Sequence, residues 1–115
     1  MLSPILTAKI AVAGAVIGCL GAVGIYWAPD EPYPHWIVAA GTVDGIVVAL
    51  LATVFIRARS SIGAALIVGA LCGLATATVV FLAKGGWSSW DAPFVIPTGV
   101  VEGLVLGAVV RRLLA

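Results

Sequence analysis

Residues 36–48 read Trp-Ile-Val-Ala-Ala-Gly-Thr-Val-Asp-Gly-Ile-Val-Val, an apolar run that contains one carboxylate, Asp44, and no basic residue. The pattern recurs without a gap at residues 94–106, Phe-Val-Ile-Pro-Thr-Gly-Val-Val-Glu-Gly-Leu-Val-Leu, 58 positions further on. The leading aromatic residue, both glycines and the acid all correspond, so Asp44 matches Glu102. We therefore expect a duplicated unit whose function depends on these two acids.

The composition indicates an integral membrane protein. Of the 115 residues, 63% are hydrophobic and 10% are charged, and the mean hydropathy is +1.23. Soluble domains have roughly 45–50% apolar and about 25% charged residues. A hydrocarbon core of about 30 Å is crossed by about 20 apolar residues in a helix. The chain has room for several such runs, which predicts an all-α, integral membrane fold.

Four transmembrane helices are expected, at about residues 5–26, 36–56, 62–82 and 94–110. The connection over residues 27–36 contains three prolines and two tryptophans, and the one over residues 84–93 contains two tryptophans, an acid and a proline. Proline breaks helices, and tryptophan is enriched at membrane–water boundaries. We expect one membrane domain, residues 1–115, with a first hairpin repeat at about 5–57 and a second at about 60–112.

The basic residues predict the orientation. One side of the expected membrane holds Lys9, Arg57, Arg59, Arg111 and Arg112, and the other holds only Lys84. The positive-inside rule then places both termini in the cytoplasm, most simply at a plasma (inner) membrane. Because each repeat has an even number of crossings, the two hairpins are expected to be tandem parallel repeats related by an axis along the membrane normal.

The two acids are expected near the middle of the bilayer. Each follows its aromatic residue by eight positions, which is about 12 Å along a helix. A carboxylate at that depth costs roughly 2.5–3.5 kcal/mol on insertion scales and usually marks a pathway or a proton site. Two facing carboxyls could bind a proton near neutrality. The candidate proton- or cation-binding residues are Asp44, Glu102, Thr42, Thr76 and Thr98.

A purely structural alternative applies to the same acids. A protonated carboxyl could bond across helices to Thr42, Thr76, Thr78 or Thr98, a contact worth about 1 kcal/mol. Close helix packing is predicted from glycines four residues apart, namely Gly14, Gly18, Gly41, Gly45, Gly69, Gly73, Gly99 and Gly103. The spacing Gly69–Gly73 repeats Gly14–Gly18 at an offset of 55. Gly21 continues the first ridge, and Pro97 is expected in about the first turn of its helix.

The remaining residues give weaker signals. His35, the single histidine, is expected in a loop, which makes a zinc site within one chain improbable. Cys19 and Cys72 are expected to be packing residues on different helices. No serine or cysteine has a histidine and an acid at a spacing typical of nucleophilic catalysis. We expect neither an enzyme nor a cofactor, and the scattered basic residues do not indicate nucleic acid; whether a metal binds stays open.

Two function classes remain. The first is a small oligomeric membrane channel or transporter for a proton, metal cation or cationic substrate, which uses the mid-membrane carboxylates. Four short helices enclose little volume, so this class requires a homo-oligomer in the lipid bilayer. The second is a non-catalytic structural or accessory subunit whose acids pair with partner membrane subunits in a larger complex.

Overall fold

The computed structural model describes residues 2–23, 33–88 and 92–115. In these ranges every regular element is a helix, and the order along the chain is α1 (Pro4–Ala22), α2 (Pro34–Phe55), α3 (Ile62–Ala83), the short 3-10 helix η2 (Gly86–Ser88) and α4 (Ala92–Leu114). All four α-helices are long and apolar enough to cross a membrane, which suggests a membrane protein. The prediction of an all-α chain with four such helices is confirmed.

Serine and proline residues determine where the helices begin. Ser3 Oγ accepts a hydrogen bond from the Leu6 N–H at 3.1 Å, and Ser61 Oγ accepts one from the Ala64 N–H at 3.1 Å. Such caps satisfy donors that the first helical turn leaves unpaired. Pro34 stands in the first turn of α2, where its missing N–H removes no helical bond.

Two glycines allow the chain to turn after α3. Gly85 and Gly86 have φ angles of +94° and +61°, a left-handed conformation that glycine adopts without a steric penalty. The turn leads into η2, where Trp87 packs edge-on against Phe81 with ring centroids 5.2 Å apart and planes at 81°. The aromatic contact therefore joins η2 to the end of α3.

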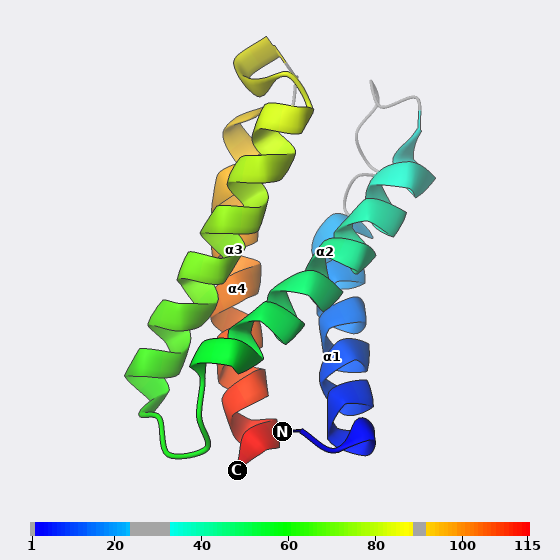
Figure 1. The fold of residues 1–115 in the computed structure, drawn as a ribbon. Coiled ribbons are helices and arrows are strands. Elements are labelled where there is room, and N and C mark those ends of the chain that lie inside the picture. The colour runs from blue at the N-terminus through cyan, green and yellow to red at the C-terminus, as the bar shows by residue number, and fades with distance from the viewer. Residues whose placement is uncertain (1, 24–32, 89–91) are drawn as a thin grey trace.

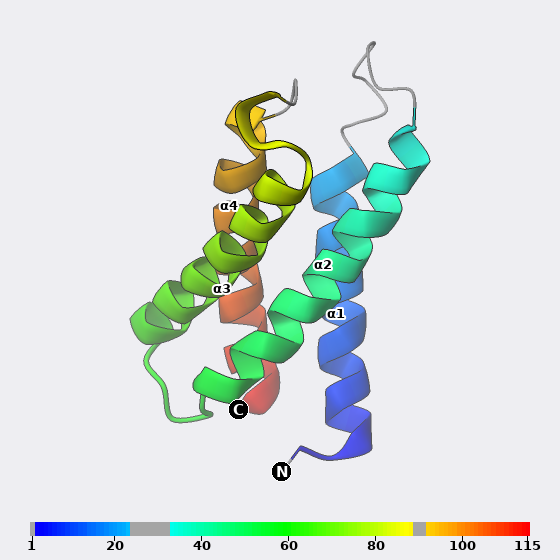
Figure 2. The same ribbon diagram turned by 45° about the horizontal axis from the view of Figure 1, so that its top comes forward.

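The helices pack as two hairpins, α1 with α2 and α3 with α4 (Figure 1). The contacts within each hairpin are more extensive than those between hairpins, where α4 touches α1 and α2, and α2 touches α3. Both termini and the α2–α3 turn lie at one end of the bundle (Figure 1). Figure 2 shows the two hairpins side by side from a second direction. The principal extents are 44 × 23 × 20 Å, so the bundle is elongated.

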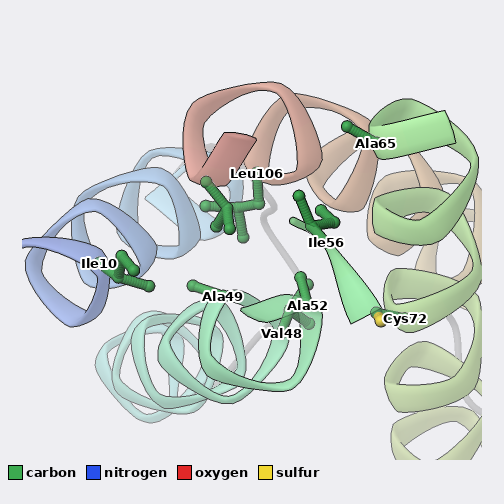
Figure 3. Close-up of a cluster of buried hydrophobic side chains, with 9 residues drawn as sticks. Ile10, Val48, Ala49, Ala52, Ile56, Ala65, Cys72 and Leu106 are labelled. Atoms are coloured by element: carbon green, nitrogen blue, oxygen red, sulfur yellow. The ribbon is translucent and has the colours of Figure 1, made fainter. Parts of the chain in front are cut away.

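The buried hydrophobic core lies toward the end that holds the termini. Its members come from all four helices and include Ile10, Val48, Ala49, Ala52, Ile56, Ala65, Cys72, Leu106 and Val110, most of which are labelled in Figure 3. In the described part of the opposite half, the buried hydrophobic residues are only Ala77 and Ala92. The two hairpins are thus joined by large side chains at one end and by much less at the other.

Within each hairpin, glycine packs on glycine. A β-carbon added to Gly14 or to Gly45 would overlap the other's backbone carbonyl, and one added to Gly18 would overlap the Gly41 carbonyl. The second hairpin makes the same contacts with Gly69 against Gly103 and Gly73 against Gly99. Glycine ridges of this kind allow two backbones to approach closely. All eight glycines that the sequence assigned to packing lie at these two crossings.

The observed helix ends correct parts of the sequence prediction. His35 lies in the first turn of α2, not in a loop, because the helix begins at Pro34, two residues before the expected start at Trp36. Helix α4 runs from Ala92 to Leu114, longer than the expected 94–110. Arginine is a good helix former and interacts favourably with a helix C-terminus, so Arg111 and Arg112 extend the last turn. The expected end of the first segment and residues 27–32 and 89–91 of the connections lie outside the described residues.

A hydrogen bond joins α4 to the α2–α3 turn. Arg111 Nε donates to the Ser60 carbonyl at 2.6 Å, and Ser60 Oγ accepts from the Arg57 N–H at 2.9 Å. The turn is therefore held against the C-terminal end of the second hairpin. Arg57 and Arg111, two residues of the basic group predicted for one side of the protein, therefore both bond to Ser60.

Candidate functional site

The glycine crossings decide where the acids point. Asp44 directly precedes Gly45, which faces α1, and Glu102 directly precedes Gly103, which faces α3. Successive residues of an α-helix are about 100° apart around its axis. Neither acid therefore points straight at its partner helix in the same hairpin, and the residues beside them, Thr76 and Gly21, belong to the other hairpin.

Asp44 is half-buried, and Thr76 of α3 is the side-chain hydroxyl available to it as a hydrogen-bond partner. The Thr76 hydroxyl donates to the carbonyl oxygen of Gly73, in its own helix, at 3.2 Å. A hydroxyl has one proton and two acceptor lone pairs. Thr76 can donate to an ionised Asp44, or accept from a protonated Asp44 while it donates to Gly73. Asp44 consequently has a partner in either protonation state.

Glu102 is also half-buried but lies against α1 at Gly21. A β-carbon on Gly21 would come within 3.1 Å of Glu102 Oε2. The other carboxyl oxygen, Oε1, is buried and has no hydrogen-bond partner. An unpartnered buried polar atom costs about 1–3 kcal/mol, and more when it is charged. Glu102 therefore has an unused binding capacity that a proton or a cation would satisfy.

The two carboxyls act on each other electrostatically. Asp44 is the charged group that influences Glu102, and their helices, α2 and α4, are in direct contact where the hairpins meet. Like charges at close range disfavour full ionisation of both groups. A proton on one of the two groups, or a cation bound at one of them, would relieve this repulsion.

An apolar groove of about 530 Å³ between α1 and α4 contains Glu102. Its lining residues are Ile17, Leu20, Gly21, Pro97, Thr98, Val101, Glu102 and Val105. Pro97 lies inside α4, about a turn and a half from its start, and not in the first turn as the sequence suggested. The reason is that α4 begins at Ala92. Because proline lacks an N–H, it cannot donate to the carbonyl four residues earlier, at Pro93.

The threonines proposed as ligands are not equivalent. Thr76 meets Asp44, as described. Thr42 Oγ1 donates to the Val38 carbonyl at 2.8 Å within its own helix. Thr98 is exposed and lines the groove one turn before Glu102. Thr78 Oγ1 donates to the Leu74 carbonyl at 2.7 Å. The structure thus brings Asp44, Thr76 and Glu102 to the meeting of the hairpins, with Thr98 at its margin.

The other polar candidates lie elsewhere. Cys72 is buried in the core, Cys19 is half-buried on α1, and both are free thiols. His35 is exposed at the start of α2, with its ring 5.8 Å from that of Trp36. Over the described ranges, no cluster of three or more histidine, cysteine or acidic residues is suited to hold a metal ion.

Sequence reasoning did not single out Gly21 as a site residue. It was grouped with the packing glycines of α1, but it faces Glu102 and lies outside both glycine crossings. A signal was present, because the offset of 55 that relates Gly14 to Gly69 relates Gly21 to Thr76.

Comparison with models of known protein families, with curated proteins and with solved structures finds no match.

Proposed function

We propose that this chain spans a membrane with its four helices and is a small transporter or channel that binds a proton or a cation at Asp44 and Glu102. The observation that supports this most directly is the unpartnered Oε1 of Glu102, a buried carboxyl oxygen beside an apolar groove. Ionisable groups in membrane-spanning helices commonly line substrate or ion pathways.

The donor set favours particular substrates. Two carboxyls and one threonine hydroxyl supply oxygen atoms and at most two negative charges. Calcium takes six to eight oxygen ligands, and zinc prefers nitrogen and sulfur. A proton, a monovalent cation or an organic cation needs fewer ligands, and the aliphatic lining of the groove suits an organic cation with an apolar body. These are the substrates that we propose.

The arrangement of the bundle supports a duplicated architecture. The two hairpins make corresponding glycine contacts, and the contact between α1 and α4 has a counterpart between α3 and α2. We propose tandem parallel repeats, about 5–57 and 60–112, related by an axis along the membrane normal. Since both termini and the α2–α3 turn share one end (Figure 1), the basic residues of that end would face the cytoplasm.

Oligomerisation is part of the proposal. The outward faces of all four helices expose large apolar side chains, among them Val12, Val47, Leu71 and Val105. Lipid or further copies of the chain would cover these faces. Because the termini-side half of the single bundle is filled by the hydrophobic core, a continuous pathway across the membrane would lie between copies.

Flux through purified protein in liposomes tests the proposal. The wild type is compared with the double variant Asp44→Asn plus Glu102→Gln, which preserves shape and removes both charges. Thr53→Val is a matched control, because Thr53 Oγ1 bonds only the Leu50 carbonyl of its own helix, at 2.6 Å. We expect proton or cation flux in the wild type and the control, and none in the double variant, with all three folded.

A different result would favour the accessory-subunit class. If the wild type shows no flux for protons, monovalent cations or organic cations, and co-purifies stoichiometrically with a larger membrane complex, the transport proposal is wrong. Undiminished flux in a folded double variant would show instead that transport does not use these acids.

A further inference from the structure

We infer that the two carboxyls have unequal roles: Glu102 is the group that exchanges the proton or cation, and Asp44 is a fixed group that Thr76 positions. The inference rests on the proposed function and deepens it. It also assigns a determining role to Gly21, the residue that leaves Glu102 without a hydroxyl partner.

The two hairpins correspond to each other in the positions around the acids. An offset of 55 relates Gly14 and Gly18 of α1 to Gly69 and Gly73 of α3, and these glycines make matching contacts. The same offset relates Gly21 to Thr76. On α2 and α4 an offset of 58 relates Asp44 to Glu102. The pair Asp44 with Thr76 therefore corresponds, position for position, to the pair Glu102 with Gly21.

The pair Asp44 with Thr76 differs chemically from the pair Glu102 with Gly21. Thr76 offers Asp44 a hydroxyl group, whereas Gly21 has no side chain to offer Glu102. The carboxyl oxygen that faces Gly21 is Oε2, and the other oxygen, Oε1, is the buried side-chain oxygen or nitrogen without a partner among the described residues. Asp44 therefore has a hydroxyl partner available within the protein, whereas Oε1 of Glu102 has none and is free for a ligand.

The two acids also differ in their access to the groove. Glu102 and Gly21 both line the groove between α1 and α4, while Asp44 is directed toward α3. The groove residues that α1 presents to Glu102 are Ile17, Leu20 and Gly21, none of which titrates. The charged group that acts on it is Asp44 of α2, and its own helix adds the Thr98 hydroxyl to the groove. A cation that enters the groove therefore meets Glu102 as its carboxyl ligand. In the proton case, protonated Glu102 releases its proton to water and becomes the carboxylate.

The reactivity of each carboxyl toward dicyclohexylcarbodiimide tests this assignment without a flux measurement. The reagent partitions into membranes and modifies protonated carboxyls, and mass spectrometry of the purified protein in liposomes locates the product. We expect Glu102 to react about fivefold faster than Asp44, which is the order of effect of one hydrogen bond.

Changing the residue beside each acid should change the reaction rate of that acid. Gly21→Ser places a hydroxyl beside Glu102 and should lower its reaction rate toward that of Asp44. Gly21 is exposed and its added β-carbon would meet only the end of the flexible Glu102 side chain, so the variant should fold. Gly63→Ser is the matched control, since a β-carbon there has nothing within 4 Å. Thr76→Val should raise the rate of Asp44, and Thr76→Ser should restore it.

The outcomes separate this inference from the proposed function. Equal rates for the two carboxyls in wild type, or rates unaffected by Gly21→Ser and Thr76→Val, would overturn the unequal roles even if the protein transports cations. Unequal rates that respond to these variants would support them. If the same liposomes then show no flux, transport is wrong while the difference between the carboxyls remains established.

Discussion

Gly14 of α1 and Gly45 of α2 lie so close that neither position can accept a β-carbon without displacing the other's backbone. This contact brings the axes of the first hairpin together, and it turns the neighbouring Asp44 toward the second hairpin. Gly69 and Gly103 have the same relationship in the second hairpin, next to Glu102. Packing and the candidate site are therefore coupled through adjacent residues.

Gly45→Ala and Gly103→Ala should each destabilise the fold. The added methyl group overlaps a backbone carbonyl, which cannot move as a flexible side chain would, and overpacking of this kind costs about 1–3 kcal/mol. Reversible unfolding in mixed detergent micelles measures the change. Gly63→Ala, where a β-carbon meets nothing within 4 Å, should leave stability unchanged. Equal stability of all three variants would mean that the paired helices accommodate the added methyl group without a loss in the free energy of unfolding.

Arg111→Gln should weaken the attachment of the α2–α3 turn to α4. The variant loses the hydrogen bond from Nε to the Ser60 carbonyl, and we expect a loss of about 1 kcal/mol in the same unfolding assay. Arg112 is exposed, so Arg112→Gln should change stability by less than about 0.5 kcal/mol. Similar losses in both variants would indicate a general effect of charge instead of this bond.

Cysteine labelling should report the orientation. In a background with Cys19→Ala and Cys72→Ala, single Ser60→Cys and Ser88→Cys variants place a thiol at opposite ends of the bundle. The basic residues predict that a membrane-impermeant reagent added to intact cells labels position 88 and not position 60. Labelling of position 60 alone from outside would reverse the proposed orientation.

The helices were predictable because each one is a long, continuous run of apolar residues in the sequence. The segment expected at 62–82 is observed at Ile62–Ala83, since a long apolar run bounded by a serine cap and glycines has few alternative structures. The start of α4 was less predictable. The sequence suggested Phe94 as the boundary, whereas Ala92 and Pro93 belong to the helix, because proline is compatible with a first turn.

The sequence pointed to the residues of the candidate site but not to their geometry. Repetition pointed to Asp44 and Glu102, and Thr76 was one of several threonines at suitable depth. Which threonine meets which acid depends on the rotation of each helix, and Thr42 instead bonds within its own helix. The role of Gly21 was hidden because a sequence does not distinguish a glycine that packs against another helix from a glycine that leaves space beside a side chain.

The single acid variants should have unequal effects on flux, because the two carboxyls have unequal partners. Glu102→Gln removes the charge from the groove and leaves no other carboxyl there, so flux should fall by at least roughly a hundredfold, equivalent to about 2.8 kcal/mol. Asp44→Asn keeps a hydrogen bond to Thr76 through the amide, and its flux should fall by only about tenfold, or about 1.4 kcal/mol.

The dependence of these fluxes on pH completes the test. Protons and cations compete for the same carboxyl oxygens, so wild-type cation flux should decrease as the pH is lowered. Asp44→Asn should keep this dependence, because Glu102 is still present to titrate. Glu102→Gln should lose it, and any residual flux should be flat with pH, since the remaining carboxyl is held by Thr76 outside the groove. A folded Glu102→Gln variant with wild-type flux and an unchanged pH profile would show that Glu102 is not the group that exchanges the proton or cation.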